Sequence, residues 1–179
     1  MTTANASDGD HSDPAVVEDQ AGALRHQIDA SAHELTGRGP AQLLESIAAL
    51  GLAWRDIAAL VGVSVPKVRR LRAGGTATDQ DCLRIAHLLA LLEWLGTDQR
   101  ITDVASWLEA PLRAGVPVSR LTLLLHDHED LVIASLAGPE FSPLQLLESF
   151  APDWRDRYDS AFEVFAASDG QQSIRPRAE

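Results

Sequence analysis

Four basic side chains gather in one short stretch of the chain. Lys67, Arg69, Arg70 and Arg72 follow one another closely, and no acidic residue occurs between Lys67 and Thr78. A guanidinium group can donate two parallel hydrogen bonds to O6 and N7 of guanine, or to the oxygens of a phosphate. The cluster is therefore suited to bind a polyanion. The plainer alternative is a solvated face of a surface helix.

The spacing of apolar residues around this cluster predicts two short helices joined by a tight turn over residues 54–73. Gly62 stands where a helix end favours a left-handed conformation, and Ser64 with Pro66 suits the start of a second helix. The apolar positions expected to face inward recur at helical spacing. They are Ile57, Ala58, Val61, Val63, Val68 and Leu71.

This stretch resembles the helix-turn-helix of the Xre-type transcriptional regulators, through small Ala58, Gly62 in the turn and the apolar positions of both helices. The resemblance implies that the second helix reads DNA from its start and its exposed face. The residues at those positions are Ser64, Val65, Pro66, Arg69 and Arg70. We interpret Arg55, Lys67, Arg72 and Thr76 as phosphate contacts, which position a protein without reading sequence. The alternative is a helical hairpin used only for packing.

The charge of the chain is unevenly distributed. The net charge is −11, which argues against a general nucleic-acid binder. However, residues 41–80 carry a net charge of +2, whereas 1–40, 81–120 and 121–179 are each negative. Local potential, rather than net charge, governs the approach to a phosphate backbone. The distribution is therefore compatible with DNA binding by the segment that contains the two short helices.

Composition and breaker residues divide the chain into four parts. We interpret 1–39 as an acidic, mostly disordered arm with a weak helix over 23–35, and 40–96 as a helix-turn-helix DNA-binding domain. Residues 97–166 would form a helical dimerisation or partner-binding domain, and 167–179 a flexible tail. The arm either competes with DNA for the basic helix or only keeps the chain soluble. Because no convincing strand pattern is present, the predicted fold is all-α: an Xre/repressor-like domain followed by a small C-terminal helical domain.

Two apolar patterns suggest extensive packing between elements. The longest predicted helix, 79–95, carries apolar residues on more than one face and should be buried on two sides; Thr78 and Asp81 would cap its start. Beyond it, Trp154, Tyr158, Phe162 and Phe165 recur at helical spacing and mark a core or a partner face. These surfaces predict a homodimer made through the C-terminal half.

Residues 104–136 resemble, more weakly, the C-terminal toxin-binding domain of the Xre/MbcA/ParS antitoxins. The shared order is Ala105, Trp107, Leu108, Pro111, Leu112, Val118, Leu121, Leu124, Asp130, Leu131, Val132 and Leu136. The chain departs from that pattern because the glycine-rich turn is reduced to Gly115 and the sequence continues well past Leu136. The resemblance implies a toxin or other protein partner, in an antitoxin that represses its own operon. The candidate partner or dimer residues are Trp107, Leu121, Leu124, Trp154, Tyr158 and Phe162.

Catalysis and membrane insertion are not indicated by the sequence. In the polar segment 126–130, His126 and His128 would face different directions if the segment were a helix, and would not converge on a metal. A polar loop with a helix N-cap at Asp127 is the better explanation. The single cysteine, Cys82, excludes a disulfide framework. The polar, acidic start is unlike a signal peptide, and no apolar run is long enough to span a bilayer.

We therefore expect a cytoplasmic, non-enzymatic regulator without a cofactor or metal, whose principal partner is double-stranded DNA. The alternative is a protein–protein adaptor, or an antitoxin, whose helix-turn-helix no longer binds DNA.

Overall fold

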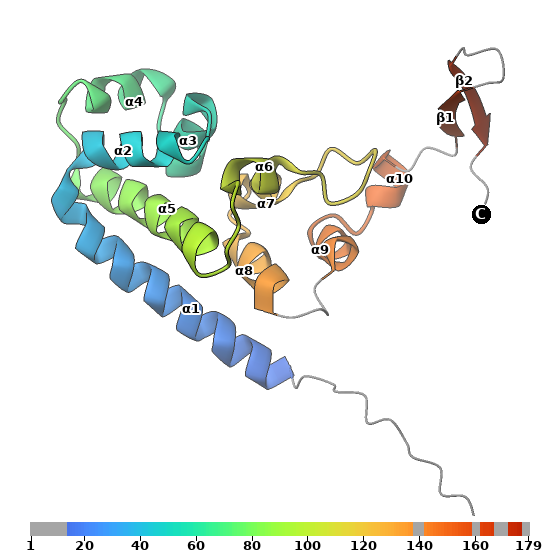
Figure 1. Cartoon of the computed structure of the whole chain (residues 1–179), viewed down its shortest axis with the longest axis horizontal. Coiled ribbons are helices and arrows are strands. Elements are labelled where there is room, and N and C mark those ends of the chain that lie inside the picture. The colour runs from blue at the N-terminus through green and yellow to red at the C-terminus, as the bar shows by residue number, and fades with distance from the viewer. Residues whose placement is uncertain (1–13, 138–141, 159–161, 167–171, 177–179) are drawn as a thin grey trace, which may run out of the picture.

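The computed structural model describes residues 14–137, 142–158, 162–166 and 172–176, and over these ranges the chain is predominantly helical, as the sequence predicts (Figure 1). In the N-terminal half the elements are α1 (Pro14–Leu35), the 3₁₀ turn η1 (Thr36–Arg38), α2 (Pro40–Ala49), α3 (Trp54–Val61), α4 (Val65–Arg72) and α5 (Asp79–Thr97). The C-terminal half contains α6 (Val104–Glu109), α7 (Arg120–Leu125), α8 (Glu129–Ala137), α9 (Pro143–Phe150), α10 (Trp154–Tyr158), β1 (Phe162–Ala166) and β2 (Gln172–Pro176).

Helix α5 is the central helix of the N-terminal half. Helices α1 and α2 pack along it, α3 contacts it, and α6 follows it into the C-terminal half (Figure 1). Its buried apolar residues are Ile85, Ala86, Leu88, Leu89, Ala90, Leu91, Leu92, Trp94 and Leu95. This set covers more than one helical face, so the predicted two-sided burial is confirmed. The predicted capping box also forms, because Thr78 and Asp81 bond reciprocally at the start of the helix.

Residues 1–39 were expected to be a mostly disordered arm with a weak helix over 23–35. The helix is present, but the disorder expected before it is wrong for 14–22, because the helical segment is Pro14–Leu35. This segment is one long helix, α1, which packs along α5 and also contacts α8. Its buried residues are Ala21, Ile28, Ala32 and Leu35. Two of them are alanines, which bury little area and leave a weak apolar pattern in the sequence. Residues 1–13 lie outside the described residues.

The turn between α3 and α4 has the predicted geometry. Gly62 adopts φ 72° and ψ 34°, and its N–H donates to the carbonyl oxygen of Ala59 at 3.0 Å. The N–H of Val63 donates to the carbonyl oxygen of Ala58 at 2.9 Å, which completes a closed helix C-terminus. The Ser64 hydroxyl then accepts from the N–H of Lys67 at 3.3 Å and caps α4. Local hydrogen bonds therefore fix the direction in which α4 begins.

In the C-terminal half, short helices pack in sequence: α6 on α7, α7 on α8, and α8 on α9. The prediction of one aromatic helix running from residue 152 through Phe165 is wrong, because α10 ends at Tyr158 and Phe162–Ala166 is a strand. This strand pairs antiparallel with Gln172–Pro176, which was expected to belong to the flexible tail. The spacing of Phe162 and Phe165 fits a helix, but Val164 and Ile174 are partners in the strand register, and β-branched residues favour strands.

Candidate nucleic-acid interface

The exposed face of α4 carries two arginines that make no intramolecular ion pair among the described residues. Arg69 and Arg70 are exposed, and neither has a carboxylate within 4 Å in those ranges. Pro66 is exposed near the start of the same helix, and Val65 is half-buried. On the inner face, Val68 and Leu71 are buried, and α2 and α3 pack against α4. The inner face of α4 is therefore packed against α2 and α3, while Arg69 and Arg70 are exposed to solvent.

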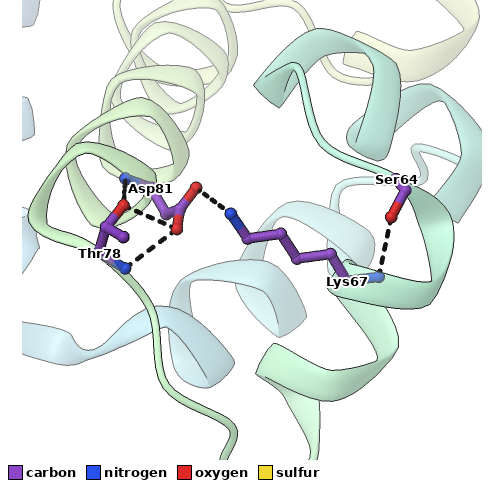
Figure 2. A network of polar contacts seen from close by, with 4 residues as sticks. All are labelled: Ser64, Lys67, Thr78 and Asp81. Atoms are coloured by element: carbon purple, nitrogen blue, oxygen red, sulfur yellow. Dashed lines mark hydrogen bonds and ion pairs between the residues drawn. The ribbon is translucent and has the colours of Figure 1, made fainter.

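Lys67, which the sequence suggested as a phosphate contact, is held by a carboxylate of α5. Figure 2 shows its side chain reaching from α4 to Asp81, with 2.7 Å between Nζ and Oδ1. The other carboxylate oxygen of Asp81 accepts from the backbone N–H and the hydroxyl of Thr78. The ion pair with Lys67, followed by the bonds from Thr78, lowers the pKa of Asp81 from 3.8 to about 2. Lys67 therefore joins α4 to the start of α5.

Arg72, also suggested as a phosphate contact, is similarly engaged. Its Nη2 lies 2.6 Å from Oε1 of Glu45 on α2, and its guanidinium stands 3.8 Å from the ring centroid of Trp54. A carboxylate and an aromatic face thus fix this side chain from two elements. Arg72 therefore joins the end of α4 to α2 and to the start of α3.

The remaining predicted phosphate contacts lie on the surface near α4. Arg55 is 85% exposed, and its Nε is 3.3 Å from Oδ1 of the neighbouring Asp56. Thr76 is exposed in the loop after α4. That loop is pinned to the helix because Gly75 donates to the carbonyl oxygen of Arg70 at 2.8 Å. A Cβ on Gly75 would lie only 2.7 Å from the same oxygen, so the close approach requires glycine.

One candidate cation was missed in the sequence analysis. Arg84 on α5 is exposed, and its Nη1 lies 3.3 Å from the position that a Cβ on Gly62 would occupy. Its guanidinium thus stands beside the turn that leads into α4. Among the described residues it makes no ion pair with a carboxylate. Apolar periodicity defined α5 but could not place Arg84. The sequence feature that could have identified Arg84 is its position one helical turn after Asp81, the partner of Lys67.

The predicted partner residues of the C-terminal half do not form one exposed face. Trp154 and Leu124 are buried within the single chain, while Trp107, Leu121 and Tyr158 are half-buried. The expectation that Trp154 and Leu124 contribute to an exposed partner surface is therefore wrong. Both belong to the hydrophobic core of the single chain. The side chain of Phe162 lies outside what the structure describes.

Arginines cover two of the tryptophans of this half. The guanidinium of Arg120 lies 4.3 Å from the Trp107 ring centroid, and burial lowers the pKa of Arg120. Arg113 and Arg155 lie 4.7 and 4.5 Å from the Trp154 ring. Both aromatic side chains are thus partly or completely buried within the single chain.

The two histidines of the polar segment both contact one ring, instead of facing different directions on a helix. His126 and His128 flank the left-handed residue Asp127 in a turn, and their rings lie 5.5 and 5.3 Å from that of Phe150. The segment is a loop, as the sequence favoured, and its turn brings both rings to the same side. In the described ranges, no group of three or more His, Cys, Asp or Glu residues could hold a metal ion.

Comparison with known proteins gives no further assignment, because no family model, curated protein or solved structure matches this chain. In the part of the chain that the structure describes, no helix is both long enough and apolar enough to cross a bilayer. The functional inference must therefore come from the arrangement of α3, α4 and α5 and from the charges they carry.

Proposed function

We propose that this protein is a sequence-specific DNA-binding regulator of transcription, with α3 and α4 as its helix-turn-helix and α4 as the recognition helix. The observation that carries the proposal is the pair Arg69 and Arg70, exposed on a helix whose start is fixed by Gly62 and Ser64. Arginines on a rigid exposed helix are suited to read guanine in the major groove.

The contacts of α4 support different roles for its basic residues. Arg69 and Arg70 would read base edges, together with Ser64, Val65 and Pro66 at the start of the helix. Ser64 uses an oxygen lone pair to cap α4, so its hydroxyl hydrogen can still be donated to DNA. Arg55, Thr76 and Arg84 would contact phosphates. Lys67 and Arg72 would instead hold α4 in position through Asp81 and Glu45.

A salt series of fluorescence anisotropy with labelled duplex DNA tests this proposal. Arg69→Ala or Arg70→Ala should each weaken binding by roughly 1–3 kcal/mol and relax base preference, because each removes a bidentate contact. Arg84→Ala should weaken all sequences alike and reduce the salt slope by about one unit. The matched control is Arg25→Ala, an exposed arginine on α1, which lies across α5 from α4 (Figure 1). Equal losses for Arg25→Ala and Arg69→Ala would contradict the assignment of α4.

One observation favours a second candidate, an adaptor or antitoxin that binds protein instead of DNA. Two of the four cations of α4 are already paired with carboxylates, and the chain as a whole carries a net charge of −11. Under this alternative, anisotropy would detect no salt-dependent binding to any duplex. The antitoxin form of the regulator adds a toxin that contacts the C-terminal helices, and copurification of a neighbouring gene product would support it.

A further inference from the structure

His87 on α5 lies between carboxylates from two other helices. Its Nδ1 is 3.2 Å from Oδ1 of Asp29 on α1, and its Nε2 is 2.9 Å from Oε2 of Glu129 on α8. The second oxygen of Glu129 is also within reach of Nε2, at 3.2 Å. One imidazole therefore links a helix from the start of the chain, the central helix and a helix of the C-terminal half.

The His87 ring can donate to both carboxylates only when its imidazole is protonated. A protonated imidazole donates from both ring nitrogens, whereas a neutral imidazole donates from one and accepts at the other. A carboxylate cannot donate to the accepting nitrogen, so a neutral His87 must lose one of its two partners. The hydrogen bond that the His87 ring donates to Glu129 is the main cause that raises the pKa of His87, and burial opposes it.

The two carboxylates are held unequally, which indicates the partner that would be lost. The Glu129 side chain is 29% exposed and presents both oxygens to Nε2, whereas the Asp29 side chain is 57% exposed and presents one oxygen at the longer distance. A neutral ring would keep its hydrogen on Nε2, towards Glu129. Its Nδ1 lone pair would then face the carboxylate of Asp29 and repel it.

His87 also lines a groove of about 670 Å³ between α1, α3, α5 and the α7–α8 turn. The other charged or titratable groups that line it are His33 from α1, Arg84 from α5 itself and Asp127 from the turn, and α3 contributes no titratable residue. His33 directs Nδ1 to the backbone oxygen of Asp29 at 2.9 Å, within its own helix. Among the described residues, Asp29 and Glu129 are thus the acids in ion-pair contact with His87.

We propose that His87, Asp29 and Glu129 form a proton-dependent clasp that fastens α1 to α5 and α8. When His87 is protonated, both helices are held along the edge of the groove. When it loses its proton, Glu129 stays bound and α1 is released from α5 at Asp29. The clasp is thus a device by which pH changes the packing of α1, and it does not depend on whether the protein binds DNA.

The sign of the pH effect follows from the raised pKa of His87. Stabilisation by the clasp is fully present below the unfolded-state pKa of histidine, about 6.5, and is lost as pH rises through the folded-state value. Amide hydrogen exchange along α1, corrected for intrinsic rates, should therefore accelerate as pH rises above about 6.5. The variant His87→Gln should remove this pH dependence, while His26→Gln, at an exposed position of α1, should leave it unchanged.

Ring titration by NMR provides a second test that does not require a His87 variant to fold. In the wild-type chain His87 should titrate above the ordinary histidine value of about 6.5. Asp29→Asn, which changes an exposed side chain, should lower the midpoint of His87 by about half a pH unit. Glu129→Gln should lower it further, because that contact is shorter and less exposed. A His87 midpoint at or below the ordinary histidine value of about 6.5, or α1 exchange without pH dependence, would overturn the clasp.

Discussion

At the residue scale, the four basic residues of α4 differ in whether a neighbouring helix supplies a carboxylate partner. Lys67 and Arg72 meet the carboxylates of Asp81 and Glu45, whereas Arg69 and Arg70 face solvent. Helical periodicity in the sequence identifies the outer face of α4. It could not identify these carboxylates, because they lie 14 and 27 residues away along the chain on other helices. The sequence therefore predicted which cations surround the helix, but not which of them are neutralised.

The variant Lys67→Ala tests this sorting. If Lys67 joins α4 to α5, the variant should lose about 1 kcal/mol of stability, the size expected of a charge-assisted hydrogen bond with a partly exposed partner. The pKa of Asp81 is lowered to about 2 in the folded chain, so this loss should be full above about pH 4 and should shrink as pH falls towards 2. Urea denaturation of both proteins across that range measures the difference. A difference in stability that does not vary with pH would contradict the assigned role.

At the element scale, the helix caps and the α3–α4 turn were predictable because their signals are local. Gly62, Ser64 and the pair Thr78 and Asp81 each act within a few residues of the helix end that they fix. Helix α1 and the hairpin of β1 and β2 depend on distant partners instead. The α1 surface is complementary to α5, and strand β1 requires β2. The sequence therefore indicated only a weak helix over 23–35, and neither the full length of α1 nor the hairpin.

Replacement of Ile28 tests whether α1 belongs to the folded core. Ile28 is 1% exposed, so Ile28→Ala should destabilise the chain by roughly 2–4 kcal/mol through lost burial and a residual cavity. Gln27→Ala, at the adjacent exposed position, should change stability by less than about 0.5 kcal/mol. Chemical denaturation followed by circular dichroism gives both values. Equal, negligible effects would mean that α1 contributes nothing to the fold.

At the scale of the whole molecule, the charge distribution and the oligomeric state determine how α4 could bind DNA. The basic face is local in an acidic chain, so binding should depend strongly on salt and orientation. The sequence suggested a homodimer through the C-terminal half, but the burial of Trp154 within one chain removes part of the predicted surface. The large apolar side chains that do remain exposed among the described residues are Leu83, Leu125 and Leu144.

We still expect a homodimer, since two-fold DNA sites are read by paired recognition helices. Multi-angle light scattering at micromolar concentration should report twice the mass of the 19.3 kDa chain. Leu125→Ser, at an exposed position, should leave the fold intact and favour the monomer if this half forms the interface. Trp154→Ala should instead destabilise the fold, by about 3–5 kcal/mol. A wild-type monomer at that concentration would contradict the expected dimer.

The central claim is that α4 reads DNA sequence, and selection of bound duplexes from a random pool tests it most directly. The wild-type chain should enrich one motif, with two half-sites about one helical turn apart if it binds as a dimer. The double variant Arg69→Ala/Arg70→Ala should lose that motif, while Arg25→Ala should retain it. A wild-type selection that enriches no motif, or a double variant that enriches the same one, would contradict the claim.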